Sequence, residues 1–164
     1  MATAVCNASP LIVLAKAGYL DVLYQLFEHI LLPKAVKSEV LSGPADDPAR
    51  IAIERGAEFE IVELEPALTP LAYWHLGRGE TEVIEYARLH PGTVALLDDL
   101  SARRWAIAIG IPVFGTLGLL ARAMKDNPAA FEGEVVKRLE AAGLRLADKV
   151  VADVIKTLKE KSRS

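Results

Sequence analysis

The chain has 164 residues, of which 52% are apolar and 25% are charged. It is therefore long enough and apolar enough to close a hydrophobic core, and its composition excludes a disordered protein. The net charge of −3 argues against a broadly basic surface for nucleic acid, although cations bound to an acidic site would reverse the local field.

Short β-rich runs alternate with helical patterns, which is typical of an α/β fold with a parallel sheet. A strand is expected at residues 3–6, and Ser9-Pro10 then predicts a helix start, with Ser9 as the N-cap and the helix ending by Gly18. The next elements along the chain are a helix across 22–28 behind Asp21, a strand at 29–32, a helix from Pro33 through Val40, a helix at 48–55 and a strand at 59–64. Residues 65–78, which include Pro66, Pro70 and Trp74, give no clear pattern.

The pattern becomes clear again from Gly79 onward. The expected order is a helix at 79–90, a buried strand at 93–97, a helix at 101–109, a short strand in PVFG and a helix at 116–125. Two amphipathic helices follow at 129–142 and 148–160. No repeat or linker divides the chain, so we expect one domain over 1–164 with a C-terminal helical extension at about 128–164.

Polar residues follow two of the predicted strands. Asn7 comes after the first, and Asp98-Asp99 come directly after the apolar run at 93–97. In an open parallel sheet, ligands bind outside the carboxyl ends of the strands. The two aspartates can also be a plain loop or N-cap pair, so their position favours a site without proving one.

Two glutamates on predicted helices are further candidates. Glu80 lies in the first turn of its helix, where a carboxylate also complements the helix dipole, and Glu39 alone would be an ordinary surface charge. Glu82 points to a different side of the helix from Glu80. Several carboxylates that meet at the strand ends could hold Mg²⁺ or Mn²⁺, which prefer oxygen ligands and can activate water for phosphodiester hydrolysis.

Other chemistries have weaker support. The histidines His29, His75 and His90 stand far apart, and no zinc-binding spacing is present. The chain also lacks a phosphate-binding P-loop and a nucleophile elbow, and Gly77-Arg78-Gly79 lacks the third glycine of a dinucleotide fingerprint.

Four segments in this order resemble the PIN-domain family: NASPLIVLAKAGYLDVL, PKAVKSEV, GRGETEVIEYA and LLDDLSARRWAIAIGIPVFGTLGLL. The likeness is closest to a branch of predicted PIN-like nucleic-acid-binding proteins, and AAGLRLADKVVADVI extends it into the tail. It implies a three-layer α/β/α sandwich with a mostly parallel sheet. It also implies a ribonuclease that needs Mg²⁺ or Mn²⁺, similar to the virulence-associated protein C toxins of toxin–antitoxin pairs.

The resemblance also assigns roles by position. The metal site falls on Asn7, Glu39, Glu80 and the Asp98-Asp99 pair, and the four carboxylates are the expected catalytic residues. Arg103 lies four residues after Asp99 and could pair with it, which would leave Asp98 as the inner ligand. Ser9 and Thr116 resemble the small hydroxyl residues that line such sites, so we expect Ser9, Arg103 and Thr116 to contact substrate.

Asn7 departs from the family pattern, which has aspartate at this position. Asn keeps a carbonyl oxygen but has no charge. At an effective dielectric near 20, a pair of unit charges about 4 Å apart interacts by up to roughly 4 kcal/mol. Loss of one anion can therefore weaken metal binding by about one or more orders of magnitude.

Three interpretations remain open from the sequence. The first is a working ribonuclease toxin that acts on single-stranded RNA, and the second is a catalytically weakened PIN fold that binds RNA or a protein. The third is a phosphoacceptor domain, but such a domain needs an acidic pair after the first strand and a lysine after the last, where this chain has Cys6-Asn7 and Gly115-Thr116.

Composition also bears on location and partners. The single cysteine is typical of a reducing compartment, no signal peptide is evident, and no apolar run approaches the roughly 20 residues of a membrane span. We therefore expect a cytoplasmic protein without a membrane partner. The mean hydropathy of +0.25 predicts that a partner covers apolar surface, and the expected partners are RNA, an antitoxin protein and a second copy in a homodimer or higher homo-oligomer.

Overall fold

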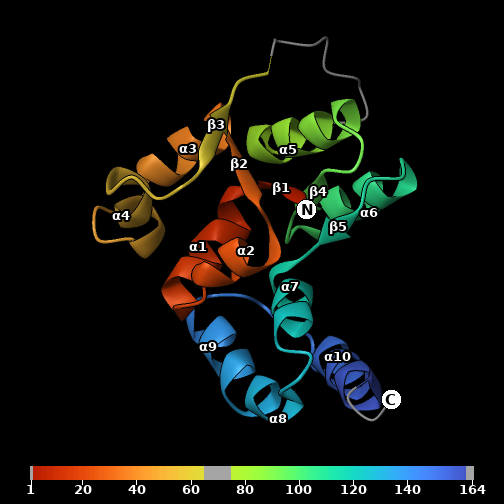
Figure 1. Ribbon diagram of the computed structural model, residues 1–164. Coiled ribbons are helices and arrows are strands. Elements are labelled where there is room, and N and C mark those ends of the chain that lie inside the picture. Colours follow the sequence, from red (N-terminus) through yellow and green to blue (C-terminus); the bar gives the residue numbers. More distant parts are fainter. Residues whose placement is uncertain (1, 65–74, 162–164) are drawn as a thin grey trace.

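The computed structural model describes residues 2–64 and 75–161 (Figure 1). Within these residues five parallel strands form one sheet in the order β3-β2-β1-β4-β5. The strands are β1 (Thr3–Cys6), β2 (His29–Pro33), β3 (Glu60–Val62), β4 (Val94–Leu96) and β5 (Val113–Phe114). They are short and rich in apolar residues, as expected of strands that are covered on both faces.

Helices cover both faces of the sheet, which confirms the predicted three-layer α/β/α fold (Figure 1). One layer holds α5 (Arg78–Leu89), which packs on β1, β2 and β4, and α6 (Leu100–Ala108), which packs on α5 and β5. The other holds α1 (Ala8–Ala17), α2 (Asp21–Leu26) and α7 (Thr116–Ala123). Helix α3 (Lys34–Leu41) contacts both α1 and α5, and α4 (Pro48–Glu54) packs beside α1 and α3.

The C-terminal segment lies beyond α1 and α7 (Figure 1). It consists of α8 (Pro128–Ala130), a π-helical turn η2 (Phe131–Val135), α9 (Val136–Ala141) and α10 (Asp148–Lys161). Helix α9 packs on α1, and α10 packs on α7 and α8. The predicted helix at 129–142 is therefore three consecutive helical pieces, and the predicted helix at 148–160 is α10.

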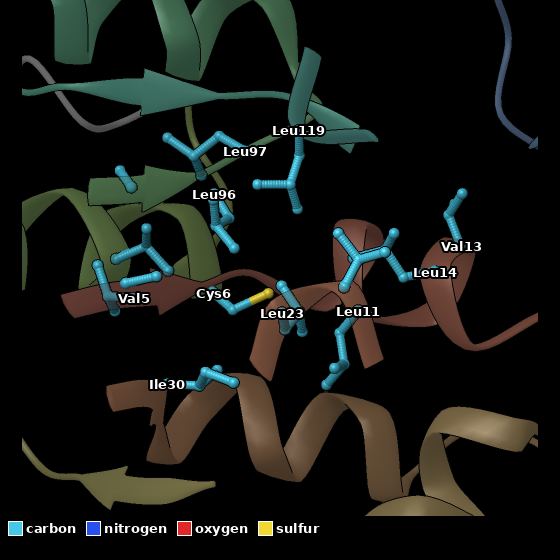
Figure 2. Packing of buried hydrophobic residues seen from close by; sticks show 14 of the residues in the cluster. Val5, Cys6, Leu11, Val13, Leu14, Leu23, Ile30, Leu96, Leu97 and Leu119 are labelled. Carbon is cyan, nitrogen blue, oxygen red and sulfur yellow. The ribbon is translucent and has the colours of Figure 1, made fainter. Parts of the chain in front are cut away.

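The core is built from side chains of both the sheet and the α1–α2–α7 layer. Figure 2 shows Cys6 of β1 and Leu96 of β4 on the side of Leu11, Leu14 and Leu23, whereas Val5, the preceding residue of β1, lies away from these leucines. All six belong to the buried apolar cluster. Burial of each such side chain stabilises the fold by about 1.5–3 kcal/mol. This burial holds β1 and α1 together and so fixes the position of Asn7, which joins them.

That junction differs from the prediction. Helix α1 begins at Ala8, so Asn7, and not Ser9, occupies the N-cap position. The backbone N–H of Asn7 still donates to the carbonyl of Leu96 at 3.1 Å, so the β1–β4 ladder continues until the helix begins. Strand β3 is also shorter than the expected 59–64. Of the unclear segment at 65–78, residues 65–74 lie outside the described residues.

No helix among the described residues is long and apolar enough to cross a membrane.

Candidate functional site

The sheet order places the ends of β1 and β4 side by side. From β1 the chain crosses to β2 on one side, and from β4 it crosses to β5 on the other. Such a change of direction opens a crevice at the carboxyl ends of the two strands. Asn7 follows β1 directly, and Asp98 follows β4 after one residue, so both lie at this edge.

Asn7 is buried, with 4% of its surface exposed. Its side-chain Nδ2 donates to Glu80 Oε1 at 3.2 Å. Its Oδ1 is buried and has no hydrogen-bond partner among the described residues. A buried acceptor without a partner costs about 1–3 kcal/mol, so this oxygen is a place where a bound group would be stabilising.

Glu39 of α3 and Glu80 of α5 lie beside Asn7. The absence of a side chain at Gly79 allows this approach, because a Cβ there would lie 2.7 Å from Asn7 Oδ1 and 3.2 Å from Glu39 Oε2. The pKa of Glu39 is raised, first by its partial loss of hydration and second by the negative charge of Glu80. The two carboxylates therefore act on each other electrostatically across the α3–α5 contact.

Asp98 forms a second group with two of the predicted hydroxyl residues. Its Oδ1 accepts from the backbone N–H of Thr116 at 2.7 Å. Its Oδ2 accepts from the hydroxyls of Thr116 at 2.8 Å and Ser9 at 3.4 Å. Asp98 thus joins the end of β4 to the first turns of α1 and α7.

Asp99 is exposed, and its Oδ1 accepts from the backbone N–H of Ala102 at 2.8 Å as the N-cap of α6. The suggested Asp99–Arg103 pair is not among the ion pairs of the described residues. Arg103 lies instead near Asp98, since a Cβ at Gly115 would be 3.2 Å from Arg103 Nη1 and 3.3 Å from Asp98 Oδ1. The helix cap, and not an ion pair, is what distinguishes Asp99 from Asp98.

The predicted residues therefore meet as two neighbouring groups. One contains Asn7, Glu39 and Glu80, and the other contains Asp98, Thr116, Ser9 and Arg103. Helix α1 links them, because Asn7 precedes its first turn and Ser9 lies within it. In the described part of the chain, no three Asp, Glu, His or Cys residues are close enough to form a metal-binding group by themselves.

The first group still has the chemistry that a hard divalent cation requires. Its donors are all oxygen atoms, and the amide oxygen of Asn7 is buried without a partner beside two carboxylates. Mg²⁺ commonly binds through one or two carboxylates and keeps several waters. Asn7, Glu39 and Glu80 therefore fit such an ion.

Sequence reasoning missed the role of Glu82. Its Oε2 accepts from the backbone N–H of Ala35 at 3.1 Å, and its Oε1 accepts from Arg78 Nε at 3.1 Å. Glu82 thus ties the first turn of α3 to α5. Its spacing from Glu80 indicates a different side of the helix, but no sequence pattern shows that α3 lies beside Glu82.

The PIN-domain family profile matches residues 3–160, which is nearly the whole chain. A comparison of this chain with curated proteins found no match.

Proposed function

The chain belongs to the PIN-domain family, a family of nuclease-type fold, and we propose that it is a metal-dependent ribonuclease that cleaves single-stranded RNA. The observation that carries the proposal is the buried, unpartnered Oδ1 of Asn7 next to the carboxylates of Glu39 and Glu80. A cation there would provide the missing partner of the amide and would offset the repulsion between the two glutamates.

In this proposal Asn7, Glu39 and Glu80 hold Mg²⁺ or Mn²⁺, and Asp98 is the inner residue of the aspartate pair. Such an ion would supply an activated water and would offset charge on the phosphate. Asp98 is held by Thr116 and Ser9, so its carboxylate has a fixed position facing the same edge. Arg103, next to Asp98, offers guanidinium donors to a phosphate.

The test is cleavage of a labelled single-stranded RNA with Mn²⁺ and with a chelator. We expect cleavage only with the ion, and at least a hundredfold loss in Glu80→Gln and Asp98→Asn. A matched control is Glu140→Gln, which removes one exposed carboxylate from the C-terminal segment and should cleave normally. Cleavage that survives the chelator, or that is equal in all variants, would contradict the proposal.

A second candidate function is a binding module for RNA or protein, favoured by one observation. The position after β1 carries neutral Asn7, so the carboxylates of Glu39 and Glu80 lie beside an uncharged amide. RNA binding without any metal-dependent cleavage would select this candidate.

For the biological role, we propose the toxin of a toxin–antitoxin pair that acts as a homodimer. The side chains of Leu89 on α5 and of Leu100 and Ile107 on α6 are apolar and exposed, which supports a protein partner on these helices. Growth arrest on expression that Glu80→Gln relieves would support the toxin role, and light scattering measures the oligomer. A monomer in light scattering would contradict the homodimer. Growth that the active protein leaves unaffected would contradict the toxin role.

A further inference from the structure

A groove between α3 and α5 leads to the candidate site. Its cavity of about 450 Å³ is lined by both Glu39 and Glu80, and also by Lys34, Ser38, Ser42 and Arg78. A substrate that reaches the two glutamates can therefore lie along this groove. We propose that the groove binds the sugar–phosphate backbone of single-stranded RNA, with Lys34 and Arg78 contacting its phosphates; this inference rests on the proposed function.

Lys34 and Arg78 lie on opposite walls of the groove. Lys34 is the first residue of α3 and Arg78 is the first residue of α5, so each stands where its helix begins. Their side chains are 62% and 84% exposed. The groove is thus lined by one cation from each helix as well as by the two carboxylates, which suits a phosphodiester chain that crosses a metal site.

Both cations already have partners, but weak ones. Lys34 Nζ lies 2.8 Å from Glu63 Oε1, and Arg78 Nε lies 3.1 Å from Glu82 Oε1. Exposed ion pairs contribute only about 0–1 kcal/mol, so phosphate oxygens can replace the glutamates. Arg78 in addition offers a planar pair of donors that matches a phosphate.

The remaining lining favours the backbone of the nucleic acid over its bases. None of the groove residues that the structure describes is aromatic, so no ring is available for stacking. The hydroxyls of Ser38 and Ser42 already donate to the carbonyls of Lys34 and Ser38, at 2.9 Å and 2.7 Å. Contacts to phosphate carry no sequence information, so binding in this groove is independent of base sequence.

The experiment measures fluorescence anisotropy of labelled RNA oligonucleotides of different sequence, over a series of salt concentrations in Ca²⁺. The RNA is checked to be intact after each titration. The test protein is the Lys34→Ala/Arg78→Ala double variant. The control is Lys149→Ala/Lys156→Ala, which makes the same charge change at exposed positions of α10. Circular dichroism melts confirm that both variants fold.

We expect the test variant to bind every sequence about tenfold more weakly. The slope of log K against log salt should fall by about 1.4, since each phosphate contact on a single strand contributes about 0.7. The control should match the wild type. Equal losses of RNA affinity in the two variants would show a general charge effect and would contradict RNA binding in the groove. Losses confined to some RNA sequences would contradict it as well.

Failure of this inference can be separated from failure of the proposed function. If the wild type cleaves RNA and the Lys34→Ala/Arg78→Ala protein binds and cleaves RNA equally well, the proposed RNA binding in the groove is wrong. The proposed ribonuclease activity is then still supported. If the wild type neither binds nor cleaves RNA, both are wrong.

Discussion

At the scale of single residues, Asn7 determines the charge of the site. Its amide donates to Glu80 and leaves Oδ1 free, so one side chain both relieves the repulsion of a carboxylate and offers a neutral ligand. We predict that Asn7→Asp tightens Mn²⁺ binding about tenfold or more and raises cleavage of single-stranded RNA, because a carboxylate binds a divalent ion more strongly. Calorimetric titration and a cleavage assay measure the two effects.

The same variant should be less stable than the wild type in a chelator. The substitution removes the amide that donates to Glu80, and it places a third anion beside Glu39 and Glu80. The melting temperature should therefore fall without metal and rise above the wild type with Mn²⁺. If both proteins respond equally to Mn²⁺, Asn7 is not a ligand.

His29 provides a pH-dependent contact away from the site. Its pKa is raised, first by the hydrogen bond to Glu60 and second by the negative charge of that residue. Because the folded pKa is above the ordinary value, the stabilisation is complete below about pH 6.5 and is lost as the pH rises through the folded pKa. NMR titration should give a midpoint above that of free histidine, and Glu60→Gln should lower it. An unchanged midpoint in that variant would exclude the pair.

Residue types and order predicted where much of the candidate site lies, but not its side-chain partners. The strand ends identified Asn7 and Asp98, since a polar residue after a buried strand marks the carboxyl edge. The helix cap of Asp99 and the Asp98–Thr116 bonds depend on how α6 and α7 meet β4, which sequence spacing cannot supply. The convergence of Glu39 with Glu80 depends on Gly79, whose small size is visible in the sequence but whose neighbours are not.

At the scale of elements, Glu82 sets the contact between α3 and α5. It is a positioning residue, because it holds the helix that carries Glu39 against the helix that carries Glu80. We predict that Glu82→Ala lowers the free energy of unfolding by about 1–2 kcal/mol, the cost of an unpaired N–H at the start of a helix. Chemical denaturation measures this loss, and Mn²⁺ affinity should fall with it.

Two matched variants separate the parts of this contact. Glu82→Gln keeps an oxygen acceptor for Ala35 and should retain most of the stability. Arg78→Ala removes only an exposed ion pair and should cost less than about 1 kcal/mol. If Glu82→Gln is as unstable as Glu82→Ala, charge and not the helix-start bond is what matters.

The helices and strands themselves were predictable because their apolar pattern is strong and because proline and glycine residues stand at helix ends. Pro48 and Gly18 mark helix ends that the structure contains. The start of α1 was misplaced because Ser9-Pro10 fits an N-cap and first helical position. Instead, α1 begins directly after the strand, with its Leu11 and Leu14 buried in the same apolar cluster as β1. Tertiary packing therefore sets the start of α1, which lies two residues before the start that the local preferences of Ser9 and Pro10 predict.

At the scale of the whole molecule, a metal site should couple binding to stability. An ion that binds only the folded state raises the melting temperature by mass action. We predict a rise with millimolar Mn²⁺ in the wild type and a smaller rise in Glu80→Gln, measured by differential scanning fluorimetry. An unchanged melting temperature in the wild type would count against the site, whatever the cleavage assay shows.

The C-terminal segment also bears on the whole molecule, because we expect it to form one cooperative unit with the sheet. Phe131 is completely buried, and Leu139 and Leu158 are buried in the same cluster as the sheet. We predict that Phe131→Ala destabilises the protein by about 3–5 kcal/mol and that one unfolding transition remains. Calorimetry measures both, with Val150→Ala as an exposed control that should change little. Two transitions, with only the first shifted, would mean that residues 128–161 unfold separately and that the domain ends before them.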